Sequence, residues 1–389
     1  MKIALLGASH PFRGGIVHFN SHLAMALHER PGLDVDLYYW SKPYPTLLLP
    51  KGPASFLDQQ SSLTFYQPGL HILNYSNPLT WISLFDRLRR GRYDILITHW
   101  VHPVHFPVLK ALFASIRLFT KTKIYLIVHN CLPHEPMLGA ASMSLSIFKT
   151  AHRIILHSTS ETQQAQNLGF FTSDMVTAFH PIFNQFIMPD EPRESIRHSL
   201  GLRGKVLLFF GFIRPYKGLS LLLEAFHNLA SRYPDVSLLV VGEHFYPTSE
   251  GLHNNGSLLD HLSANDPIRS QIILIDRYVA NEEVGRYFAI ADVLVAPYLS
   301  TTQSGPIQIA YAFDKPVIAS DLPAFRQCVS HGESGYLFST GNAQDLTEKL
   351  ELFLDKPITI EQVHRYRQVF KWESYVEMLL KPSKALETR

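Results

Sequence analysis

Short apolar runs that alternate with helix-length segments dominate the sequence. In the first half, the candidate strands are residues 2–8, 34–40, 70–75, 94–100, 123–130, 153–158 and 175–180. Helix-length stretches lie between several of them, at residues 15–29, 79–90 and 104–119. Continuous apolar strands of this length that alternate with helices are typical of a parallel sheet covered on both faces. Residues 41–69 depart from the pattern and predict a long functional loop.

The alternation stops at residues 181–195, PIFNQFIMPDEPRES, where prolines and acidic residues predict a linker. It then restarts, with candidate strands at 205–211, 236–242, 272–275, 292–298, 316–320 and 335–338 and helices at 217–231, 281–290, 305–313 and 342–354. We therefore predict an α/β chain of two tandem Rossmann-like, doubly wound domains that face each other across a cleft. The predicted domains are residues 1–184 and 185–371, with a C-terminal helix over 372–389 that packs back on the first.

The length and composition agree with two globular domains. A chain of 389 residues is too long for one ordinary core. We find no apolar run of the roughly 18–20 residues that a membrane-spanning helix needs, and the first apolar run predicts a strand instead of a signal peptide. Cys131 and Cys328 lack metal-ligand spacing, so we expect a cytoplasmic location.

Charge is distributed unevenly between the halves. Residues 1–185 carry 15 Lys and Arg against 9 Asp and Glu, and they hold 13 of the 20 histidines, whereas the net charge of the whole chain is only +2. This asymmetry indicates an anionic partner or surface for the first domain, although chance variation between two surfaces explains it equally well. The overall balance argues against a nucleic-acid partner.

Three loops that follow predicted strands carry candidate ligand-binding residues, because ligands of doubly wound folds bind beyond the carboxyl ends of strands. In the first loop, Gly14 and Gly15 precede a helix, where glycines let backbone N–H groups approach an anion. An ordinary turn between strand and helix is the alternative.

The second loop, GFIRPYKGL at 211–219, places Arg214 and Lys217 close to a predicted helix start. Two cations near the positive end of a helix are unfavourable, and a bound diphosphate would offset this. Two solvated surface cations are the alternative.

The third loop, STTQSGPIQ at 300–308, combines hydroxyls and amides with Gly305 and with a proline suited to the first helical turn. It predicts an uncharged cradle for a phosphate or for the hydroxyl groups of a sugar.

Taken in order, these segments resemble those of the GT-B glycosyltransferases, in particular the retaining family four (group 1) that uses nucleotide-sugar donors. The resemblance rests on PFRGGIVHFNSHLAMAL near the start, HNCLPHE (129–135), GFIRPYKG (211–218), ADVLVAPY with SGPIQIAYAFDKPVIASD (291–321), GYLF (335–338) and FKWESYVEML (370–379), and it spans nearly the whole chain. It implies that His129 contacts the transferred sugar, that Glu135 acts as an acid, a base or an orienting group, and that Val279 holds the base. The implied donor-binding set is Gly14, Gly15, Arg214, Lys217, Val279, Thr301, Gln303, Ser304, Gly305 and Gln308.

The sequence departs from the family pattern in one respect. Relatives place two glutamates eight positions apart in the third loop and its helix, whereas Thr301 and Ile309 stand at the aligned positions here. Gln303, Ser304 and Gln308 are expected to supply neutral hydrogen bonds instead, as in a subgroup of the family that lacks the paired glutamates.

The resemblance implies transfer of a hexosyl group, with retention, from a UDP- or GDP-linked donor to a glycan or a lipid-linked acceptor, as in polysaccharide biosynthesis. Cations and helix ends would stabilise the leaving diphosphate, so no metal and no cofactor are expected. Arg13, His102 and His105 are predicted on the acceptor side; zinc bound by His99, His102 and His105 is a weaker alternative. A non-catalytic GT-B protein that binds glycans or partners, and a nucleotide-sugar epimerase, are the competing functions.

Residues 106–123 combine a helical apolar pattern with Lys110, Arg117, Lys121 and Lys123. Such a helix predicts a peripheral contact with the inner face of the plasma membrane. A core helix with a solvated basic face is the alternative.

Overall fold

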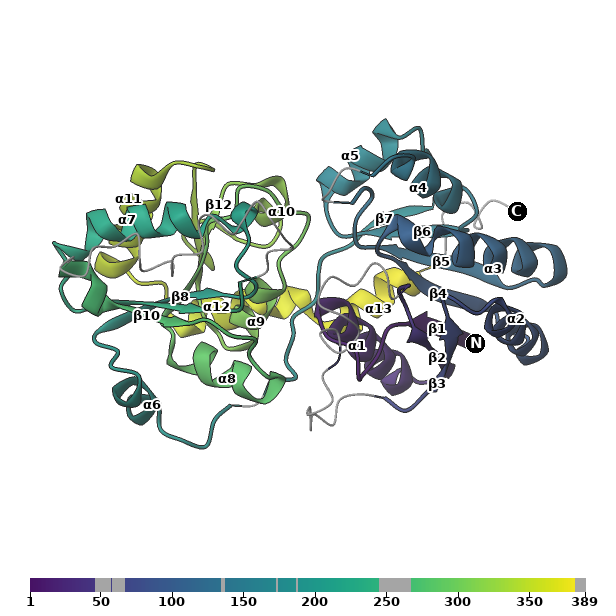
Figure 1. Cartoon of the computed structure of the whole chain (residues 1–389), viewed down its shortest axis with the longest axis horizontal. Helices are drawn as coiled ribbons and strands as arrows, with labels where there is room; N and C mark the ends of the chain where they lie inside the picture. Colours follow the sequence, from purple (N-terminus) through teal and green to yellow (C-terminus); the bar gives the residue numbers. More distant parts are fainter. Residues whose placement is uncertain are drawn as a thin grey trace. The chain divides into compact units, whose positions relative to one another are not determined.

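The computed structural model describes residues 1–45, 57, 67–133, 137–172, 174–186, 188–244 and 267–381. The chain divides into two compact units (Figure 1), the first made of Met1–Pro181 with Phe370–Arg389 and the second of Ile182–Val369. Each unit contains a parallel sheet with alternating helices, which confirms the prediction of two Rossmann-like α/β folds. The division falls after residue 181, a few residues before the predicted boundary at 184, and the chain returns to the first unit at Phe370.

The sheet of the first unit has seven strands in the order β3-β2-β1-β4-β5-β6-β7. The strands are β1 (Lys2–Gly7), β2 (Asp34–Lys42), β3 (Leu70–Asn74), β4 (Ile95–Trp100), β5 (Lys123–Val128), β6 (Arg153–Leu156) and β7 (Met175–Thr177). The helices are α1 (Gly15–Glu29), α2 (Pro78–Gly91), the 3-10 turn η3 (Pro103–His105), α3 (Phe106–Phe119), α4 (Ala140–Phe148), α5 (Thr159–Asn167) and α13 (Trp372–Leu380). The C-terminal helix thus begins where the sequence predicts, and its observed end lies at Leu380.

Alternation of side chains along the strands divides the first unit into two layers of helices. Leu126 and Val128 of β5 share a buried cluster with residues of α2, α3, α4 and α5. Side chains of opposite parity, including His99 of β4, meet the ring of Phe19 in α1, which also contacts Trp372 of α13. Helices α2 to α5 therefore cover one face of the sheet, and α1 with α13 covers the other (Figure 1).

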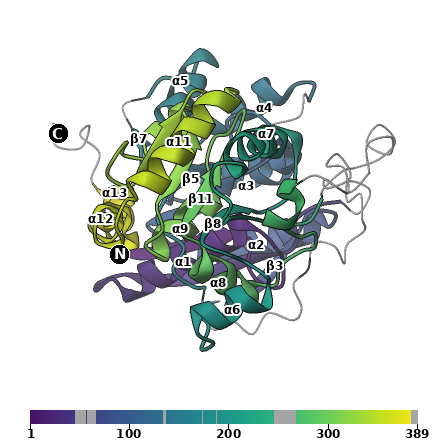
Figure 2. The same ribbon diagram turned by 90° about the vertical axis from the view of Figure 1, so that its left-hand side faces the viewer.

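The second unit has a six-stranded parallel sheet in the order β10-β9-β8-β11-β12-β13 (Figure 2). Its strands are β8 (Lys205–Phe210), β9 (Val236–Val241), β10 (Ile272–Ile275), β11 (Val293–Ala296), β12 (Val317–Ser320) and β13 (Gly335–Phe338). Its helices are α6 (Arg193–Ser199), the 3-10 turns η4 (Pro215–Lys217) and η6 (Pro267–Gln271), α7 (Leu219–Ala230), α8 (Asn281–Ile290), α9 (Gly305–Ala312), α10 (Pro323–Arg326), α11 (Ala343–Asp355) and α12 (Ile360–Tyr366). The 3-10 turn η7 (Arg367–Phe370) spans the point where the chain returns to the first unit. Strands β8 and β11 lie side by side at the centre of the sheet, so the loops that follow them are neighbours.

Helix α3 covers most of residues 106–123, for which the sequence allows either a membrane-contact helix or a core helix. Its apolar positions are buried in the core of the first unit, which agrees with the core-helix alternative; they are Val108, Leu109, Leu112, Phe113 and Ile116. Its last two residues differ, because Leu118 and Phe119 are 75% and 67% exposed. None of the helices in the described ranges is long and apolar enough to cross a membrane.

Candidate functional site

The loop between β8 and α7 brings a buried ammonium group against a glycine. Gly211 follows β8 with a φ of 103°, and a Cβ atom at this position would lie 2.8 Å from Nζ of Lys217. A side chain at residue 211 would therefore be strained by its backbone conformation and would compete with the ammonium for space. The glycine leaves the end of β8 open to Lys217.

A second glycine fixes this loop against the end of β11. Gly218 has a φ of 68°, and a Cβ atom there would lie 1.9 Å from the carbonyl oxygen of Pro297, so this close approach requires a glycine. The backbone N–H of Leu299 donates to the carbonyl of Tyr216 at 2.7 Å. Helix α7 begins at Leu219 and not at residue 217 as predicted, because Gly218 in its left-handed conformation separates it from the turn η4.

Lys217 carries a buried cation that no carboxylate neutralises among the described residues. Its side chain is 8% exposed, and Nζ lies 5.5 Å from the centroid of the Tyr298 ring. Burial, with a smaller contribution from the Arg214 guanidinium, lowers the pKa of Lys217 to about 8. Two adjacent cations in a partly desolvated loop favour the binding of an anion.

The start of α9 adds two unpaired polar atoms to the same edge of the sheet. Ser304 is the N-cap of this helix, which continues through Gly305 and Pro306. Within the part of the chain that the structure describes, Oγ of Ser304 and Oε1 of Gln308 are buried and have no partner at full hydrogen-bond geometry, and the Tyr298 hydroxyl is the polar group beside Oγ of Ser304. An unpaired buried polar atom costs about 1–3 kcal/mol, so a ligand that pairs with these atoms would recover that free energy.

The other predicted donor residues lie around this edge. The hydroxyl of Thr301 donates to the carbonyl of Gln303 and accepts from the backbone N–H of Gln303 at 3.2 Å, so it shapes the loop from within. Val279 is buried between β10 and α8, at the same carboxyl end of the sheet. Ile309, at the second family glutamate position, is a core side chain.

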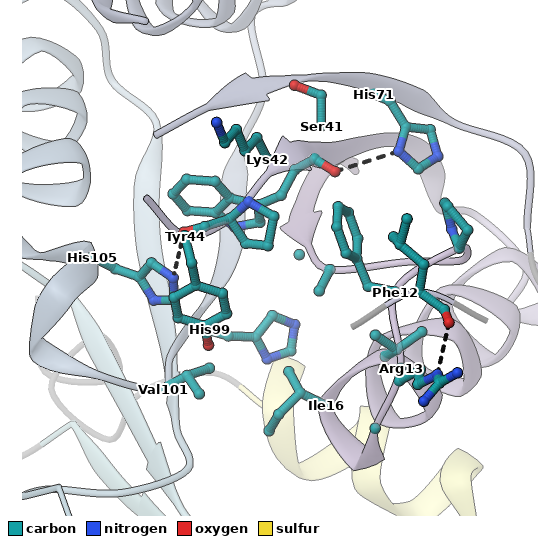
Figure 3. Close-up of a pocket in the computed structure, with 18 of the residues that line it drawn as sticks. Phe12, Arg13, Ile16, Ser41, Lys42, Tyr44, His71, His99, Val101 and His105 are labelled. Carbon is teal, nitrogen blue, oxygen red and sulfur yellow. Dashed lines mark hydrogen bonds between the residues drawn. The ribbon is translucent and has the colours of Figure 1, made fainter. Parts of the chain in front are cut away.

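The first unit contains a mostly apolar cavity of about 730 Å³ at the carboxyl ends of β1, β2 and β4 (Figure 3). Its wall includes Phe12, Trp40 and Tyr44, and its floor includes the predicted loop glycines Gly14 and Gly15. Arg13 and Lys42 are the charged side chains in the described lining, which holds no carboxylate. The cavity therefore favours a ligand with an apolar part and a negative charge.

Gly14 and Gly15 form the turn into α1. Gly14 has a φ of 109°, which favours glycine, and its carbonyl accepts from the N–H groups of Val17 and His18. Nothing lies within 4 Å of the position that a Cβ atom would take at either glycine. The loop thus exposes backbone to the cavity, while Nε of Arg13 donates to the carbonyl of Leu57 at 2.7 Å (Figure 3).

The two histidines predicted on the acceptor side have different environments. His105 lines the cavity and pairs with the carbonyl of Pro43 at 3.1 Å, and burial lowers its pKa to about 4, so its ring is neutral at pH 7. His102 is absent from the lining: its Nδ1 accepts from the N–H of Val104 and caps the turn η3. The cap occupies Nδ1 of the ring, and the acceptor-side role of His102 stays a prediction. No group of three His, Cys, Asp or Glu that could hold a metal occurs in the described ranges.

His129, the predicted sugar-contacting residue, belongs to a buried cluster of histidines on the face of the sheet that α1 covers. Nε2 of His129 lies 3.0 Å from Nδ1 of His99, and the ring of Phe19 makes edge contacts with both. Burial and the neighbouring His99 lower the pKa of His129 well below its usual value. Glu135, the other predicted catalytic residue, lies outside the described residues.

Several residues of these sites escaped the sequence-based predictions. Tyr298, Trp40 and Tyr44 appear in the sequence as ordinary apolar residues. His99 stood out only through its spacing from other histidines, a pattern that pointed toward zinc. Its position near the end of β4 was a usable signal, because ligands of this fold bind at that edge.

Comparison with known proteins agrees with this geometry. Residues 204–356, which include β8, η4 and α9, match the family model of the glycosyl transferases group 1. The chain is 25% identical over 278 residues to the D-inositol 3-phosphate glycosyltransferase of Thermobispora bispora, which covers 69% of this chain and 64% of that protein. It is 32% identical over 165 residues to the phosphatidyl-myo-inositol mannosyltransferase of Mycobacterium leprae, which covers 41% of this chain and 40% of that protein. The matches thus cover less than two thirds of the length of these relatives.

Solved structures show the same fold over the whole chain. The Anabaena protein HepE in complex with UDP and glucose superimposes with a TM-score of 0.70, at 14% identity, over 100% of both chains. The lipopolysaccharide outer core galactosyltransferase WaaB superimposes with a TM-score of 0.67, at 13% identity, over 97% of this chain and 99% of that one. The fold is that of the GT-B class. The resemblance to the group 1, family-four-like glycosyltransferases is confirmed by the family match and by these relatives.

Proposed function

We propose that this protein transfers a hexosyl group from a UDP- or GDP-linked sugar to a lipid-linked or glycan acceptor, with retention and without a metal ion. The observation that carries the proposal is the buried ammonium of Lys217, which has no carboxylate partner in the described structure and lies in the loop next to the start of α9. The names of the relatives, which include inositol phosphate glycosyltransferases and a mannosyltransferase, support this class of reaction. The complex of HepE with UDP-glucose supports a nucleotide-sugar donor.

The second unit would bind the donor through charge and hydrogen bonds. Lys217 and Arg214 would neutralise the diphosphate, and the first N–H groups of α9 would add their partial positive charge. Ser304 and Gln308 would use their unpaired oxygens on donor hydroxyl groups. Charge that develops on the leaving diphosphate would meet groups that are already in place, which is the most effective form of electrostatic catalysis.

Retention in this proposal needs no nucleophile from the protein. The acceptor hydroxyl attacks the anomeric carbon on the face from which the diphosphate leaves, and a donor phosphate oxygen takes the hydroxyl proton. The bond between the anomeric carbon and the phosphate oxygen breaks as the new glycosidic bond forms. The neutral side chains at the two family glutamate positions agree with this mechanism, because the cations and the diphosphate balance each other's charge without a carboxylate.

The first unit would bind the acceptor in its apolar cavity. Trp40, Tyr44 and Phe12 offer surface for a lipid chain, and Arg13 and Lys42 offer charge for a lipid phosphate. An uncharged glycan would bury most of its hydroxyl groups against this apolar wall without hydrogen-bond partners, which costs free energy. We therefore favour a lipid-linked acceptor over a free glycan.

A second surface of the first unit supports a proposed peripheral contact with an anionic bilayer. Leu118 and Phe119 are exposed at the end of α3, and they line a hollow together with four basic residues: Arg89, Arg92, Lys121 and Lys123. Exposed apolar side chains surrounded by cations are suited to the headgroup region of anionic lipids. This contact would bring the enzyme to a lipid-linked acceptor.

A thermal-shift screen against UDP-, GDP-, ADP- and CMP-sugars tests the donor site. A ligand at about 100 times its Kd adds roughly 2.7 kcal/mol of stability. We expect a shift with one of these donors, and we expect Lys217→Met to abolish it. Lys315→Met is the matched control, because Lys315 is equally buried but its ammonium donates to the carbonyl of Ala289 at 3.1 Å.

The screen also separates the competing functions. A donor-induced shift that survives in Lys217→Met would remove this lysine from the site. Binding without any hydrolysis or transfer of the sugar would indicate a non-catalytic GT-B protein. Conversion of the donor to its epimer in the absence of acceptor would indicate an epimerase.

A further inference from the structure

A chain of hydrogen bonds connects α1 with His129 through His99. Oδ1 of Asn20 in α1 lies 2.8 Å from Nε2 of His99 in β4, and Nδ1 of His99 lies 3.0 Å from Nε2 of His129, directly after β5. All three side chains are buried. The three residues are far apart in the sequence and meet only because β4 and β5 are adjacent and α1 covers their face of the sheet.

The amide oxygen of Asn20 determines where the ring protons lie. With the amide oxygen of Asn20 turned toward His99, Nε2 of His99 carries the proton, because an amide oxygen accepts hydrogen bonds only. In this orientation Nδ2 of Asn20 is buried and has no hydrogen-bond partner among the described residues. Burial lowers the pKa of His99 to about 3, so the ring is neutral and its Nδ1 must be an acceptor. Nε2 of His129 therefore carries a proton and donates a hydrogen bond to Nδ1 of His99. The other nitrogen of the neutral His129 ring, Nδ1, is left without a proton.

The packing holds this chain in one geometry. The rings of His99 and His129 are stacked with their centroids 5.2 Å apart, and the Phe19 ring stands edge-on to both. Gly7, at the end of β1, provides the space for Asn20, because a Cβ atom at residue 7 would lie 2.2 Å from Oδ1 of Asn20. A larger residue at position 7 would displace the amide that orients both rings.

We propose that Asn20 and His99 are positioning residues that keep His129 in the tautomer with its proton on Nε2, so that Nδ1 accepts a hydrogen bond from a hydroxyl group of the transferred sugar. Nδ1 of His129 has no protein partner within the described part of the chain, so this nitrogen remains available for a ligand. The inference rests on the proposed function only in its last step, the contact between His129 and the sugar. His99 also lines the acceptor cavity (Figure 3), where its ring forms part of the wall while both of its nitrogens are used inside the protein.

The tautomer of His129 can be measured without any substrate. In the ¹⁵N-labelled protein at pH 7, long-range proton–nitrogen correlation spectra distinguish the protonated from the unprotonated ring nitrogen of each histidine. We expect His129 and His99 both to show protonated Nε2 and unprotonated Nδ1. A wild-type spectrum with the proton on Nδ1 of His129 would overturn the proposal, whatever the variants do.

Three substitutions on α1 separate positioning from packing. Asn20→Leu keeps the approximate volume and removes the acceptor, so it should yield a mixture of His129 tautomers. It should lower kcat about tenfold and change the KM for the donor less than about twofold. In a serine protease, the loss of a group that fixes the histidine tautomer lowers kcat far more. Asn20→Asp keeps an acceptor oxygen and should retain the wild-type tautomer. Ser21→Ala, at a buried neighbouring position whose hydroxyl donates to the carbonyl of Val17, should change neither readout.

These experiments distinguish failure of the proposed hydrogen-bond chain from failure of the proposed function. An unchanged His129 tautomer in Asn20→Leu would overturn the positioning role of Asn20 and His99, even in an active enzyme. The expected tautomers in a protein that transfers no sugar to any acceptor would support this positioning role and contradict the proposed function.

Discussion

The indole of Trp372 stacks on the imidazole of His22, with ring centroids 5.4 Å apart and the ring planes inclined by 16°. This contact joins α13, the last described helix of the chain, to α1, the first helix. The neighbouring Tyr375 continues the junction, because its hydroxyl lies 3.0 Å from Nε2 of His157. The C-terminal helix is thus part of the layer that covers the buried histidines of the first unit.

Removing the indole should destabilise the first unit. Trp372 is almost fully buried, and replacing a buried Trp by Ala costs about 3–5 kcal/mol. We expect Trp372→Ala to lower the free energy of unfolding of the first unit by at least about 3 kcal/mol, as measured by urea denaturation. Lys371→Ala, at an exposed neighbouring position, is the control and should lie within about 0.5 kcal/mol of wild type. Equal stability of the two variants would contradict the packing described for α13.

Acid should destabilise the first unit because its histidines are buried in the neutral form. Burial, together with the neighbouring His22, lowers the pKa of His18 to about 3, and burial lowers the pKa of His99 to about 3 and that of His180 to about 4. Below pH 6.5 the unfolded chain binds protons that the folded unit does not, so stability falls with falling pH by up to about 1.4 kcal/mol per histidine and pH unit. Above pH 7 stability should be nearly constant.

Urea titrations at pH 7.5 and 5.5 measure this effect. His18→Asn should reduce the difference in unfolding free energy between the two pH values, whereas His198→Asn, at an exposed position of the second unit, should leave it unchanged. A first unit that is equally stable at both pH values would show that the histidines are protonated in the folded state.

Donor binding should weaken in mildly alkaline solution. The pKa of Lys217 is about 8 in the free protein, because burial and the adjacent Arg214 disfavour its charge. The ammonium is charged below this pH and neutral above it, so the Kd for the diphosphate-linked donor should rise between pH 7 and 9.5. Calorimetric titrations at the two pH values measure the change. Lys217→Arg keeps its charge throughout and should flatten the profile; a flat wild-type profile would exclude Lys217 as a diphosphate ligand.

The unpaired oxygens of Ser304 and Gln308 predict opposite effects on stability and on binding. Ser304→Ala and Gln308→Leu each remove a buried polar atom that lacks a partner, so the melting temperature of the free protein should stay the same or rise. The affinity for the donor should fall about tenfold, since one hydrogen bond is lost. Thr301→Ala is the contrast, because its hydroxyl bonds within the loop and its removal should lower the melting temperature. Lower stability in all three variants would mean that Ser304 and Gln308 hold the loop.

The exposed end of α3 predicts binding to anionic vesicles. The double change Leu118→Ser and Phe119→Ser should reduce co-sedimentation with phosphatidylglycerol vesicles at least fivefold, while phosphatidylcholine vesicles should bind neither protein. Phe171→Ser is the matched control, because Phe171 is 74% exposed elsewhere on the same unit. Equal losses in the two variants would indicate non-specific adsorption.

Much of the fold could be predicted because it depends on local patterns. The strands at residues 2–7 and 205–210 are continuous apolar runs, and helix-length segments separate neighbouring runs, which is enough to indicate parallel sheets. The loops that carry Gly14 and Lys217 were found for the same reason, since each follows such a run directly. The start of α7 could not be predicted in this way, because it is set by the left-handed conformation of Gly218 and its close approach to Pro297.

Local patterns in the amino-acid sequence are enough to predict the two α/β folds, the order of their elements and the loops at the carboxyl ends of the strands. The folded structure was needed to show that Thr301 bonds within its loop, that His102 caps a turn and that Asn20, His99 and His129 form one chain. The difference lies in the range of the interactions. Periodicity reflects the backbone geometry of a few neighbouring residues, whereas burial, the pKa of a side chain and its hydrogen-bond partner depend on groups that folding brings together from distant parts of the chain.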